Sequence, residues 1–523
     1  MKRTTLTSLV LFFLVLIVGV IVAPQIAPFW DEPDNIYAAG VYIRFFRSGF
    51  DRRILLNASP KSDFGDRIVT QDATLSHYPP VPNYVGAIIA VIGNRLGILQ
   101  GSKGLIIAFH ITAALFFALL VVMVYQWSIL LGFSQLVGIF TALVTFLFPS
   151  LFGYGYSDLK DIAVASLITT SLYVLVKGAI VEKRRIIISG ALLWGITVAS
   201  KCNAIFVPFI WGIWLVISDK QHDFRRKFQT ILTNFLPVAI IGILTAIAVW
   251  PYLWFDTLVH IKEIISYFAT VGRGYHVFFA GRTYTAGIDR MWWYPWIHLL
   301  YITPPVLWIL AIASFLRLNK RPTLPYHGMT LLIFWICLPL VRSFIPHAVF
   351  YDGIRHALEV IPPLILLAAT GLTEILQWTK RKTAPSVIVV LALSVFLGFL
   401  SYTNIRLFPY STGYLNFLSP NPNNTFDRDI GGISVKEALD YLHATYGPVN
   451  VWIPISAHQA WSYFLTNDCD MAGKPALADY IIIINKRSNS DRWQLEKDMN
   501  NRYSLIYTVS RGKNVFAWIY KTK

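Results

Sequence analysis

Long apolar segments constrain this chain more than any other feature of its sequence. A helix needs roughly 20 apolar residues to cross the hydrocarbon core of a bilayer. Apolar runs of about that length occupy residues 6–28, 104–131, 135–152, 161–181, 186–200, 203–218, 231–250, 296–316, 328–345, 357–378 and 385–405. The runs 186–200 and 203–218 are the shortest. The pattern predicts a polytopic α-helical membrane protein with about eleven transmembrane helices.

The composition agrees with this prediction. Of the 523 residues, 55% are hydrophobic and only 14% are charged, which excludes disordered chains and ordinary soluble proteins. The formal charge of +17 does not point to nucleic acid, because most basic residues lie in short clusters between apolar runs. The three cysteines lie far apart, so neither a disulfide framework nor a cysteine metal site is expected.

The basic clusters predict the orientation of the chain in the membrane. They lie at Lys2-Arg3, 182–185, 219–227, 317–321 and 379–382. If the N-terminus is cytoplasmic and every run spans, all of them fall on the cytoplasmic side, as the positive-inside rule requires. The first run is alternatively a cleaved signal peptide, which leaves the later topology unchanged.

This orientation places several segments outside the cytoplasm, at a plasma or inner membrane or in an ER-like lumen. They are residues 29–103, 153–160, 250–295, 346–356 and everything after about 406. We therefore expect a transmembrane module over 1–405, with 29–103 as its first outer loop, and an extracytoplasmic domain over 406–523.

The last hundred residues have the pattern of a small α/β domain. Residues 433–447 have helical periodicity and end in glycine. Residues 449–455 and 478–485 are typical of strands, and 504–521 of a hairpin around Gly512.

Charged residues are costly at membrane depth, yet groups of them lie at the predicted outer ends of apolar runs. Asp31 and Glu32 follow the first run directly; they either end a helix in a solvated loop or take part in chemistry. Asp158 and Asp161 precede the fourth run, where a helix N-terminus favours carboxylates, so capping explains one of them. Lys160 beside them is unfavourable there unless an anion is bound.

Two further groups lie at the same predicted face. Lys201 separates two short apolar runs and is either a snorkelling lysine or a functional cation. Asp352, Arg355 and His356 have the spacing i, i+3, i+4, so we expect them to share one helix face. An internal Asp–Arg pair that orients the helix is the alternative.

Together these groups form complementary sets of carboxylates and cations. The carboxylates are Asp31, Glu32 and Asp161; the cations are Lys160, Lys201 and Arg355, with His356 and His77 as additions. A sugar donor carried on a lipid phosphate needs cations that neutralise its anionic leaving group. An acceptor hydroxyl needs a carboxylate that takes its proton as the new bond forms.

The chain resembles GT-C glycosyltransferases of the family that contains protein O-mannosyltransferases and the aminoarabinose transferases of lipid A (family 39-like). The resemblance lies in "WDEPDN" (30–35), "SDLKDIAVA" (157–165), "SKCNAIFVP" (200–208), "FYDGIRHALEVIPP" (350–363) and the region 408–442 that ends in "KEALDYL". It covers about the first 445 residues. The 350–363 stretch and the "KEAL" region are the most specific parts, and the acidic pair alone is weak.

The resemblance implies roles for these residues. Asp31 matches an acidic residue that acts as catalytic base or metal contact, with Glu32 beside it. The donor phosphate would be bound by Lys160, Lys201, Arg355 and His356, supported by Asp161, Asp352 and His77. "SDLKD" lacks the proline that usually precedes Lys-Asp, and "RDIGG" replaces an aromatic-rich stretch, so acceptor choice does not carry over.

The resemblance therefore predicts an inverting membrane glycosyltransferase that uses a polyprenyl-phosphate sugar. Its partners would be this donor, membrane lipids and an acceptor lipid, glycan or protein, without nucleic acid. A membrane transporter or lipid-linked sugar flippase is the alternative, but such proteins place polar sites near the bilayer midplane and often contain inverted repeats. A structural protein explains the C-terminal domain but not the charged residues. Asp31 and Asp161 offer oxygen ligands to Mg²⁺ or Mn²⁺, although carboxylates alone do not fix an ion.

Overall fold

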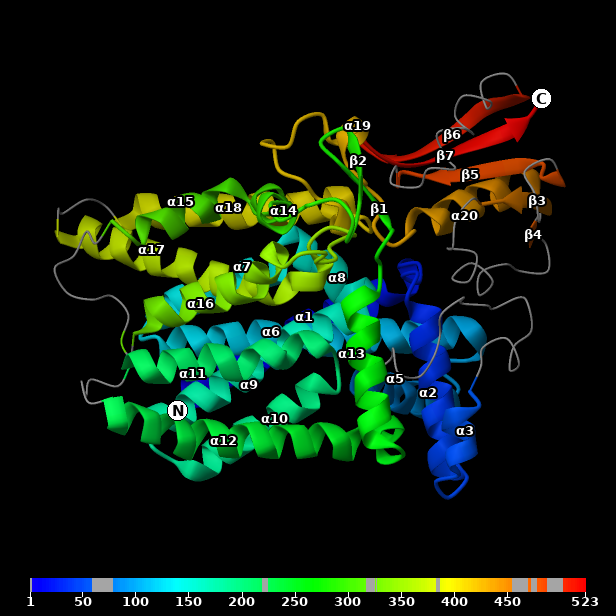
Figure 1. Cartoon of the computed structure of the whole chain (residues 1–523). Helices are drawn as coiled ribbons and strands as arrows, with labels where there is room; N and C mark the ends of the chain where they lie inside the picture. Colours follow the sequence, from blue (N-terminus) through cyan, green and yellow to red (C-terminus); the bar gives the residue numbers. More distant parts are fainter. Residues whose placement is uncertain are drawn as a thin grey trace.

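The computed structural model describes residues 2–58, 79–218, 224–316, 325, 327–381, 386–453, 469–471, 477–486 and 502–523. Most long helices run in a common direction, and the C-terminal sheet lies at one end of them (Figure 1). The start of α12 and the facing ends of α17 and α18 lie toward the other end, as does the N-terminus (Figure 1). These are the ends next to which the sequence places basic clusters.

Most of the predicted apolar runs form helices. Within the described residues, six helices are long and apolar enough to cross a membrane: α1 (Lys2–Val22), α6 (Gly101–Leu130), α9 (Leu159–Ile180), α12 (Phe224–Val249), α17 (Ile361–Arg381) and α18 (Ser386–Leu407). Two bent helix pairs raise this number to eight if each pair is one span. Shorter helices are α10 (Arg184–Val198), α11 (Phe206–Ser218) and α16 (Gly328–Val341). The chain is thus mostly helical with six to eight candidate spans, and the number eleven stays a prediction.

Prolines break two runs that were expected to be continuous. The run 135–152 divides into α7 (Gln135–Leu147) and α8 (Pro149–Ser157), bent by 62°. The run 296–316 divides into α14 (Tyr294–Ile302) and α15 (Pro305–Ala313), bent by 106°. A proline lacks the amide hydrogen and disfavours helical backbone in the residue before it. The segment 153–160 was expected as a loop, but it belongs to α8 as far as Ser157 and to α9 from Leu159 onward.

The interior of the helical part is organised around α6. This helix packs against α1, α5 (Val81–Arg95), α7 and α9. The indole nitrogen of the buried Trp127 donates to the carbonyl of Thr169 at 3.0 Å, and the hydroxyl of Tyr156 donates to that of Val15 at 3.0 Å. These bonds satisfy polar groups that a lipid environment would leave unpaired.

The segment 29–103, which the sequence predicts to be the first outer loop, contains further helices. They are α2 (Glu32–Arg47), α3 (Arg52–Leu56) and α5, the first two of which run across the direction of the long helices, as does α13 (Thr257–Thr270) (Figure 1). Phe45 of α2 is fully buried and contacts Trp254 and Phe255, just before α13. The last turns of α2 are thereby packed against the chain that leads into α13.

The C-terminal part contains the helix and strands that the sequence predicts. Helix α20 (Ser434–Tyr446) ends at Gly447, whose φ is +75°. The sheet has the strand order β4-β3-β5-β7-β6, with β3–β5 parallel and β5–β7 and β6–β7 antiparallel. Its strands are β3 (Val449–Trp452), β4 (Cys469–Met471), β5 (Tyr480–Ile484), β6 (Tyr503–Arg511) and β7 (Asn514–Thr522). Strand β5 is buried throughout.

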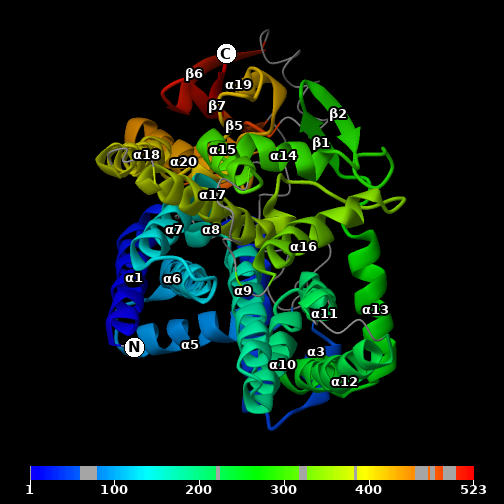
Figure 2. The same cartoon turned by 90° about the vertical axis from the view of Figure 1, so that its left-hand side faces the viewer.

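A second, two-stranded sheet was not predicted. Strands β1 (His276–Phe279) and β2 (Arg282–Thr285) pair antiparallel, and Phe279 forms a bridge with Phe426. In both views the hairpin lies beside α19 (Pro422–Thr425) and the C-terminal strands (Figure 2). The remaining short helices are η1 (Ala23–Gln25), η4 (Cys202–Ile205), η5 (Pro251–Trp254), η6 (Arg342–Phe344), η7 (Arg355–Val360) and η8 (Ser411–Gly413).

Candidate active site

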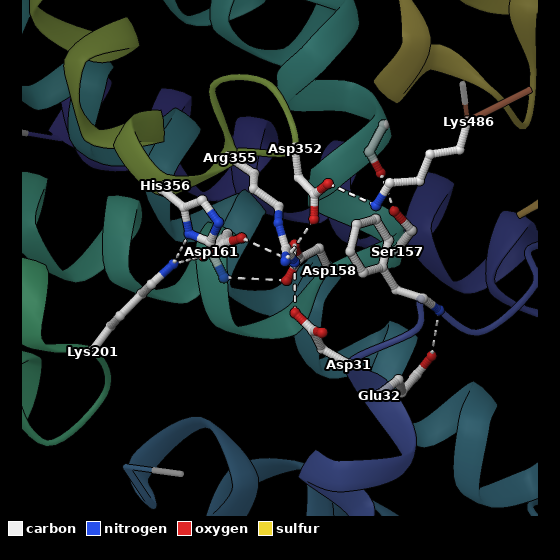
Figure 3. Close-up of polar contacts among 12 residues, drawn as sticks. Asp31, Glu32, Ser157, Asp158, Asp161, Lys201, Asp352, Arg355, His356 and Lys486 are labelled. Atoms are coloured by element: carbon white, nitrogen blue, oxygen red, sulfur yellow. Dashed lines mark hydrogen bonds and ion pairs between the residues drawn. The ribbon is translucent and has the colours of Figure 1, made fainter. Parts of the chain in front are cut away.

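Four carboxylates surround the guanidinium of Arg355 (Figure 3). Its Nη1 donates to Oδ2 of Asp31 at 2.5 Å, and its Nη2 lies 3.1 Å from Oδ2 of Asp352. Carboxylate oxygens of Asp158 and Asp161 each lie 4.0 Å from Nη1. We call these five residues the Arg355 cluster. A buried guanidinium needs such anionic partners to offset the loss of hydration.

The cluster joins segments that are far apart in the sequence. Asp31 precedes α2, Asp158 and Asp161 lie at the start of α9, and Asp352 lies in the loop that leads to Arg355 at the start of η7. The cluster therefore forms where the chain entering α2 meets the start of α9 and the chain entering α17.

Asp31 is the accessible carboxylate of the cluster. Its side chain is 43% exposed, whereas those of Asp158 and Asp161 are 3% exposed and that of Asp352 is 8% exposed. A molecule arriving from outside the protein meets Asp31 first.

Asp158 has a structural role that the sequence anticipates. It is the N-cap of α9, and its Oδ1 accepts from the amide of Asp161 at 3.3 Å. Burial raises the pKa of Asp158 well above its usual range, the nearby Asp161 raises it further, and Arg355 partly offsets both. Capping thus explains one of the two aspartates, as predicted.

Lys201 approaches the cluster beside Asp161 and His356 (Figure 3). It lies in the break between α10 and η4, and its ammonium forms an ion pair with Oδ1 of Asp161. The same ammonium lies 3.5 Å from Nδ1 of His356. The backbone carbonyl of His356 accepts from Asn203 at 2.6 Å and from Arg342 at 2.7 Å, so this part of η7 is held by side chains of two other segments.

Lys160 occupies the first turn of α9. Its charge interacts with those of Asp31, Asp34, Lys201 and Asp161. The structure therefore brings together Asp31, Lys160, Asp161, Lys201, Asp352, Arg355 and His356 of the residues named from the sequence.

The prediction that Asp352, Arg355 and His356 share one helix face is wrong. Asp352 lies in a turn with a left-handed φ of +54°, and Gly353 follows with a φ of +72°. Helix η7 begins only at Arg355. The amide of Gly353 donates to the hydroxyl of Tyr294 at 2.9 Å, which fixes the turn. Asp352 and Arg355 still form the internal ion pair that was the alternative.

Glu32 is not brought to the cluster. Its side chain is buried, and its Oε2 accepts from the amide of Phe29 at 3.2 Å and lies 3.1 Å from Nε2 of His110. Nδ1 of His110 lies 3.1 Å from the carbonyl oxygen of Ala23. Burial raises the pKa of Glu32, and His110 partly offsets this. Glu32 therefore anchors the end of α1 and the start of the outer loop to α6.

The described carboxylates do not fit a divalent metal. No group of three or more His, Cys, Asp or Glu side chains in the described part of the chain is arranged to hold an ion. Asp31 and Asp161, the residues expected to bind Mg²⁺ or Mn²⁺, both face the guanidinium of Arg355. This cation already supplies the positive charge between them. His77 lies outside the described residues.

Sequence reasoning missed Lys486 and His110. The Nζ of Lys486 donates to Oδ1 of Asp352 at 2.8 Å (Figure 3) and lies 3.6 Å from the ring centroid of Trp30. His110 carried a signal, since a lone histidine in an apolar run is costly unless it has a partner. Lys486 was detectable only as a charge directly after a buried strand.

Known proteins resemble this chain in structure. No family model matches the sequence, and no curated protein sequence matches it. The ArnT of Cupriavidus metallidurans, solved bound to undecaprenyl phosphate, aligns with a TM-score of 0.50 at 13% identity over 98% of this chain and 97% of that one. The archaeal oligosaccharyltransferase AglB from Archaeoglobus fulgidus, solved with an inhibitory peptide and a dolichol-phosphate, aligns with a TM-score of 0.49 at 12% identity over 97% of this chain and 74% of that one.

At this identity the likeness concerns the fold, and it extends over nearly the whole of both this chain and ArnT. The described helices supply six to eight candidate spans, in agreement with an integral membrane protein. The chain has the GT-C fold of membrane glycosyltransferases.

Proposed function

We propose that this chain is an integral-membrane, inverting glycosyltransferase that moves a sugar from a polyprenyl-phosphate donor to an acceptor hydroxyl. The observation that carries the proposal is the accessible carboxylate of Asp31, held by the buried Arg355 at one end of the long helices. An exposed base beside fixed cations is what transfer from a phosphate leaving group requires.

In this reaction Asp31 is the general base. It accepts the proton of the acceptor hydroxyl while the oxygen of that hydroxyl forms a bond to the anomeric carbon. The bond between this carbon and the phosphate oxygen breaks, and its electron pair leaves with the polyprenyl phosphate. One displacement from the face opposite the leaving group inverts the anomeric configuration.

The cations Lys160, Lys201 and Arg355 act on the leaving group as proposed contacts of the donor phosphate, and His356 is a proposed hydrogen-bonding contact. Asp161 and Asp352 orient Lys201 and Arg355 by their ion pairs. Charges fixed before the reaction stabilise developing negative charge without reorganisation in the transition state.

The donor class has independent support. The ArnT with the same fold was solved with undecaprenyl phosphate bound. Membership of family 39 rests on the four stretches around residues 30–35, 157–165, 200–208 and 350–363 and on the 408–442 region, and remains part of the proposal.

We place the site and residues 406–523 on the extracytoplasmic face, with the N-terminus in the cytoplasm. The argument is the positive-inside rule. The described helix ends next to the basic clusters lie at the end of the molecule away from the C-terminal sheet (Figure 1).

The test is turnover by the purified chain in lipid with a panel of polyprenyl-phosphate sugars. The proposal expects one donor to be consumed, with release of polyprenyl phosphate and an inverted product. A chain that consumes none of them, but moves a lipid-linked sugar across sealed vesicles, would be a transporter, and the proposal would fail.

A further inference from the structure

A lysine of the C-terminal sheet enters the Arg355 cluster. Lys486 lies two residues after β5, and its Nζ donates to Oδ1 of Asp352 at 2.8 Å (Figure 3). The same Nζ lies 3.6 Å from the ring centroid of Trp30, the residue before Asp31. The lysine thus contacts one residue next to Asp31 in the sequence and one ion-pair partner of Arg355.

The position of Lys486 is fixed by its neighbour. Asn485 is fully buried, its amide donates to the carbonyl of Phe516 at 2.6 Å and its side chain donates to that of Val515 at 2.8 Å. Its own carbonyl accepts from the amides of Arg428 and Asp429 at 2.8 and 3.1 Å. These four hydrogen bonds hold the backbone and the side-chain nitrogen of Asn485, so Lys486 leaves the sheet at a defined point.

Alternating charges connect the sheet to the accessible carboxylate. Lys486 pairs with Oδ1 of Asp352, Oδ2 of Asp352 pairs with Arg355, and Arg355 pairs with Asp31. Apart from Asp31, these side chains are 4–15% exposed, so solvent screens their interactions weakly.

The alternating charges indicate how Lys486 affects the orientation of Arg355. Arginine prefers to bind both oxygens of one carboxylate. Lys486 donates to Oδ1 of Asp352, Nη2 of Arg355 pairs with Oδ2 of the same carboxylate, and Nη1 of Arg355 donates to Asp31. Loss of the lysine would leave Oδ1 of Asp352 to compete with Asp31 for Nη1 of Arg355.

We propose that Lys486 is a positioning residue for sugar transfer, which acts through Asp352 to keep Arg355 on Asp31. The C-terminal sheet is then part of the transfer machinery. This inference rests on the proposed function. It also gives a reason for a further link between the two parts, the hydrogen bond from the amide of Trp30 to the carbonyl of Gly431 at 3.2 Å.

The first experiment compares Lys486→Met and Lys486→Arg with wild type in the full chain. The matched control is Lys436→Met, which removes another lysine–aspartate pair of the C-terminal part, to Asp440 at 2.7 Å, away from the cluster. We expect Lys486→Met to lower kcat about tenfold or more with little change in donor KM. Lys486→Arg should recover most of the loss, and Lys436→Met should match wild type.

The second experiment tests whether Lys486 acts through Asp352 or only attaches the C-terminal sheet to the helices. If Lys486 acts through Asp352, the two substitutions are not additive, so Lys486→Met should cost less than about twofold in an Asp352→Asn background. Full additivity would overturn the inference. Unfolding temperatures in detergent monitor folding, and a Lys486→Arg protein that is folded but as slow as Lys486→Met would also overturn it.

The outcomes for wild type are distinct from these. If the wild-type protein turns over a donor and Lys486→Met has the same kcat as Lys436→Met, the proposed function stands and only this inference is removed. No wild-type turnover with any donor would contradict both.

Discussion

Neighbouring residues at the start of α2 have opposite environments. The side chain of Asp31 is 43% exposed and contacts Arg355, whereas that of Glu32 is 4% exposed and contacts His110. Successive residues of an α-helix point about 100° apart, so two adjacent acids at a helix start face different surroundings. The acidic pair in the sequence therefore supplies one residue to the cluster and one to the interior.

The geometry of the buried pair predicts its importance for stability. Nδ1 of His110 faces a carbonyl and must donate, so Nε2 shares its proton with Glu32. Glu32→Ala leaves the histidine without this partner and the amide of Phe29 without its acceptor. We expect a loss of about 3 kcal/mol of unfolding free energy, measured by denaturation in detergent.

The exposed Glu182 provides the control, because Glu182→Gln should unfold like wild type. The Glu32→Ala protein that does fold should turn over donor within a few-fold of wild type. If it folds normally but is as inactive as Asp31→Asn, then Glu32 is catalytic and our placement of it is wrong.

At the scale of elements, α8 must pack closely on the chain that enters the C-terminal part. A Cβ at Gly153 would meet the amide nitrogen of Thr412 and come within 2.8 Å of the carbonyl carbon of Ser411. Both are backbone atoms that no rotamer change can move. We expect Gly153→Ala to cost about 2 kcal/mol of stability and to lower turnover, because α8 leads directly to Asp158.

Gly398 of α18 is the matched control for Gly153. A Cβ there meets nothing within 4 Å, so Gly398→Ala should leave the unfolding temperature unchanged or raise it slightly, since alanine favours helix. Equal behaviour of the two variants would show that α8 does not need this close contact.

The contact of α20 with the β6–β7 hairpin predicts a pH dependence. Burial would raise the pKa of Glu437, but hydrogen bonds from Arg511 at 2.6 Å and Tyr410 at 2.6 Å lower it below its usual 4.5. A carboxyl with a depressed pKa in the folded state stabilises the fold above its usual pKa and loses that contribution as the pH falls through the folded value.

Glu437→Gln should therefore be less stable than wild type by about 1 kcal/mol at pH 7. The difference should shrink as the pH falls below about 4. Unfolding temperatures of both proteins across this range provide the measurement, and a difference that is independent of pH would contradict the role of the ion pair.

At the scale of the molecule, the sequence predicted the elements whose formation depends on local residue patterns. Apolar runs located the helices, and strand and glycine patterns located α20, β5 and the β6–β7 hairpin. The residues of the Arg355 cluster were predicted as charges at the outer ends of runs. The left-handed turn at Asp352 is accompanied by a contact with Lys486 and by the hydrogen bond from Gly353 to Tyr294, and the spacing of residues 352–356 encodes neither contact.

The parts that escaped prediction are contacts between distant segments. Lys486 is more than 130 positions from Asp352, and His110 is 78 positions from Glu32. Their positions are set by how the C-terminal sheet and α6 pack against the outer loop. The bends of the α7–α8 and α14–α15 pairs were signalled by prolines, but a bend angle depends on the neighbouring helices.

The candidate site is assembled from four segments that are far apart in the sequence. The chain before α2 supplies Asp31, α9 and its N-cap supply Asp158 and Asp161, the break after α10 supplies Lys201 and the chain before α17 supplies Arg355. Arg355 pairs with Asp31, and Lys201 pairs with Asp161. The central claim of the proposed function is that Asp31 is the general base.

The measurement that tests this claim most directly is the turnover rate of Asp31→Asn with a donor that wild type uses. Asp51→Asn is the control, because Asp51 caps α3 in the same outer loop and pairs with Arg53. With donor binding measured separately, we expect kcat of Asp31→Asn to fall by a factor of roughly 10² or more with the donor still bound, and Asp51→Asn to match wild type. Wild-type turnover by Asp31→Asn would contradict the account.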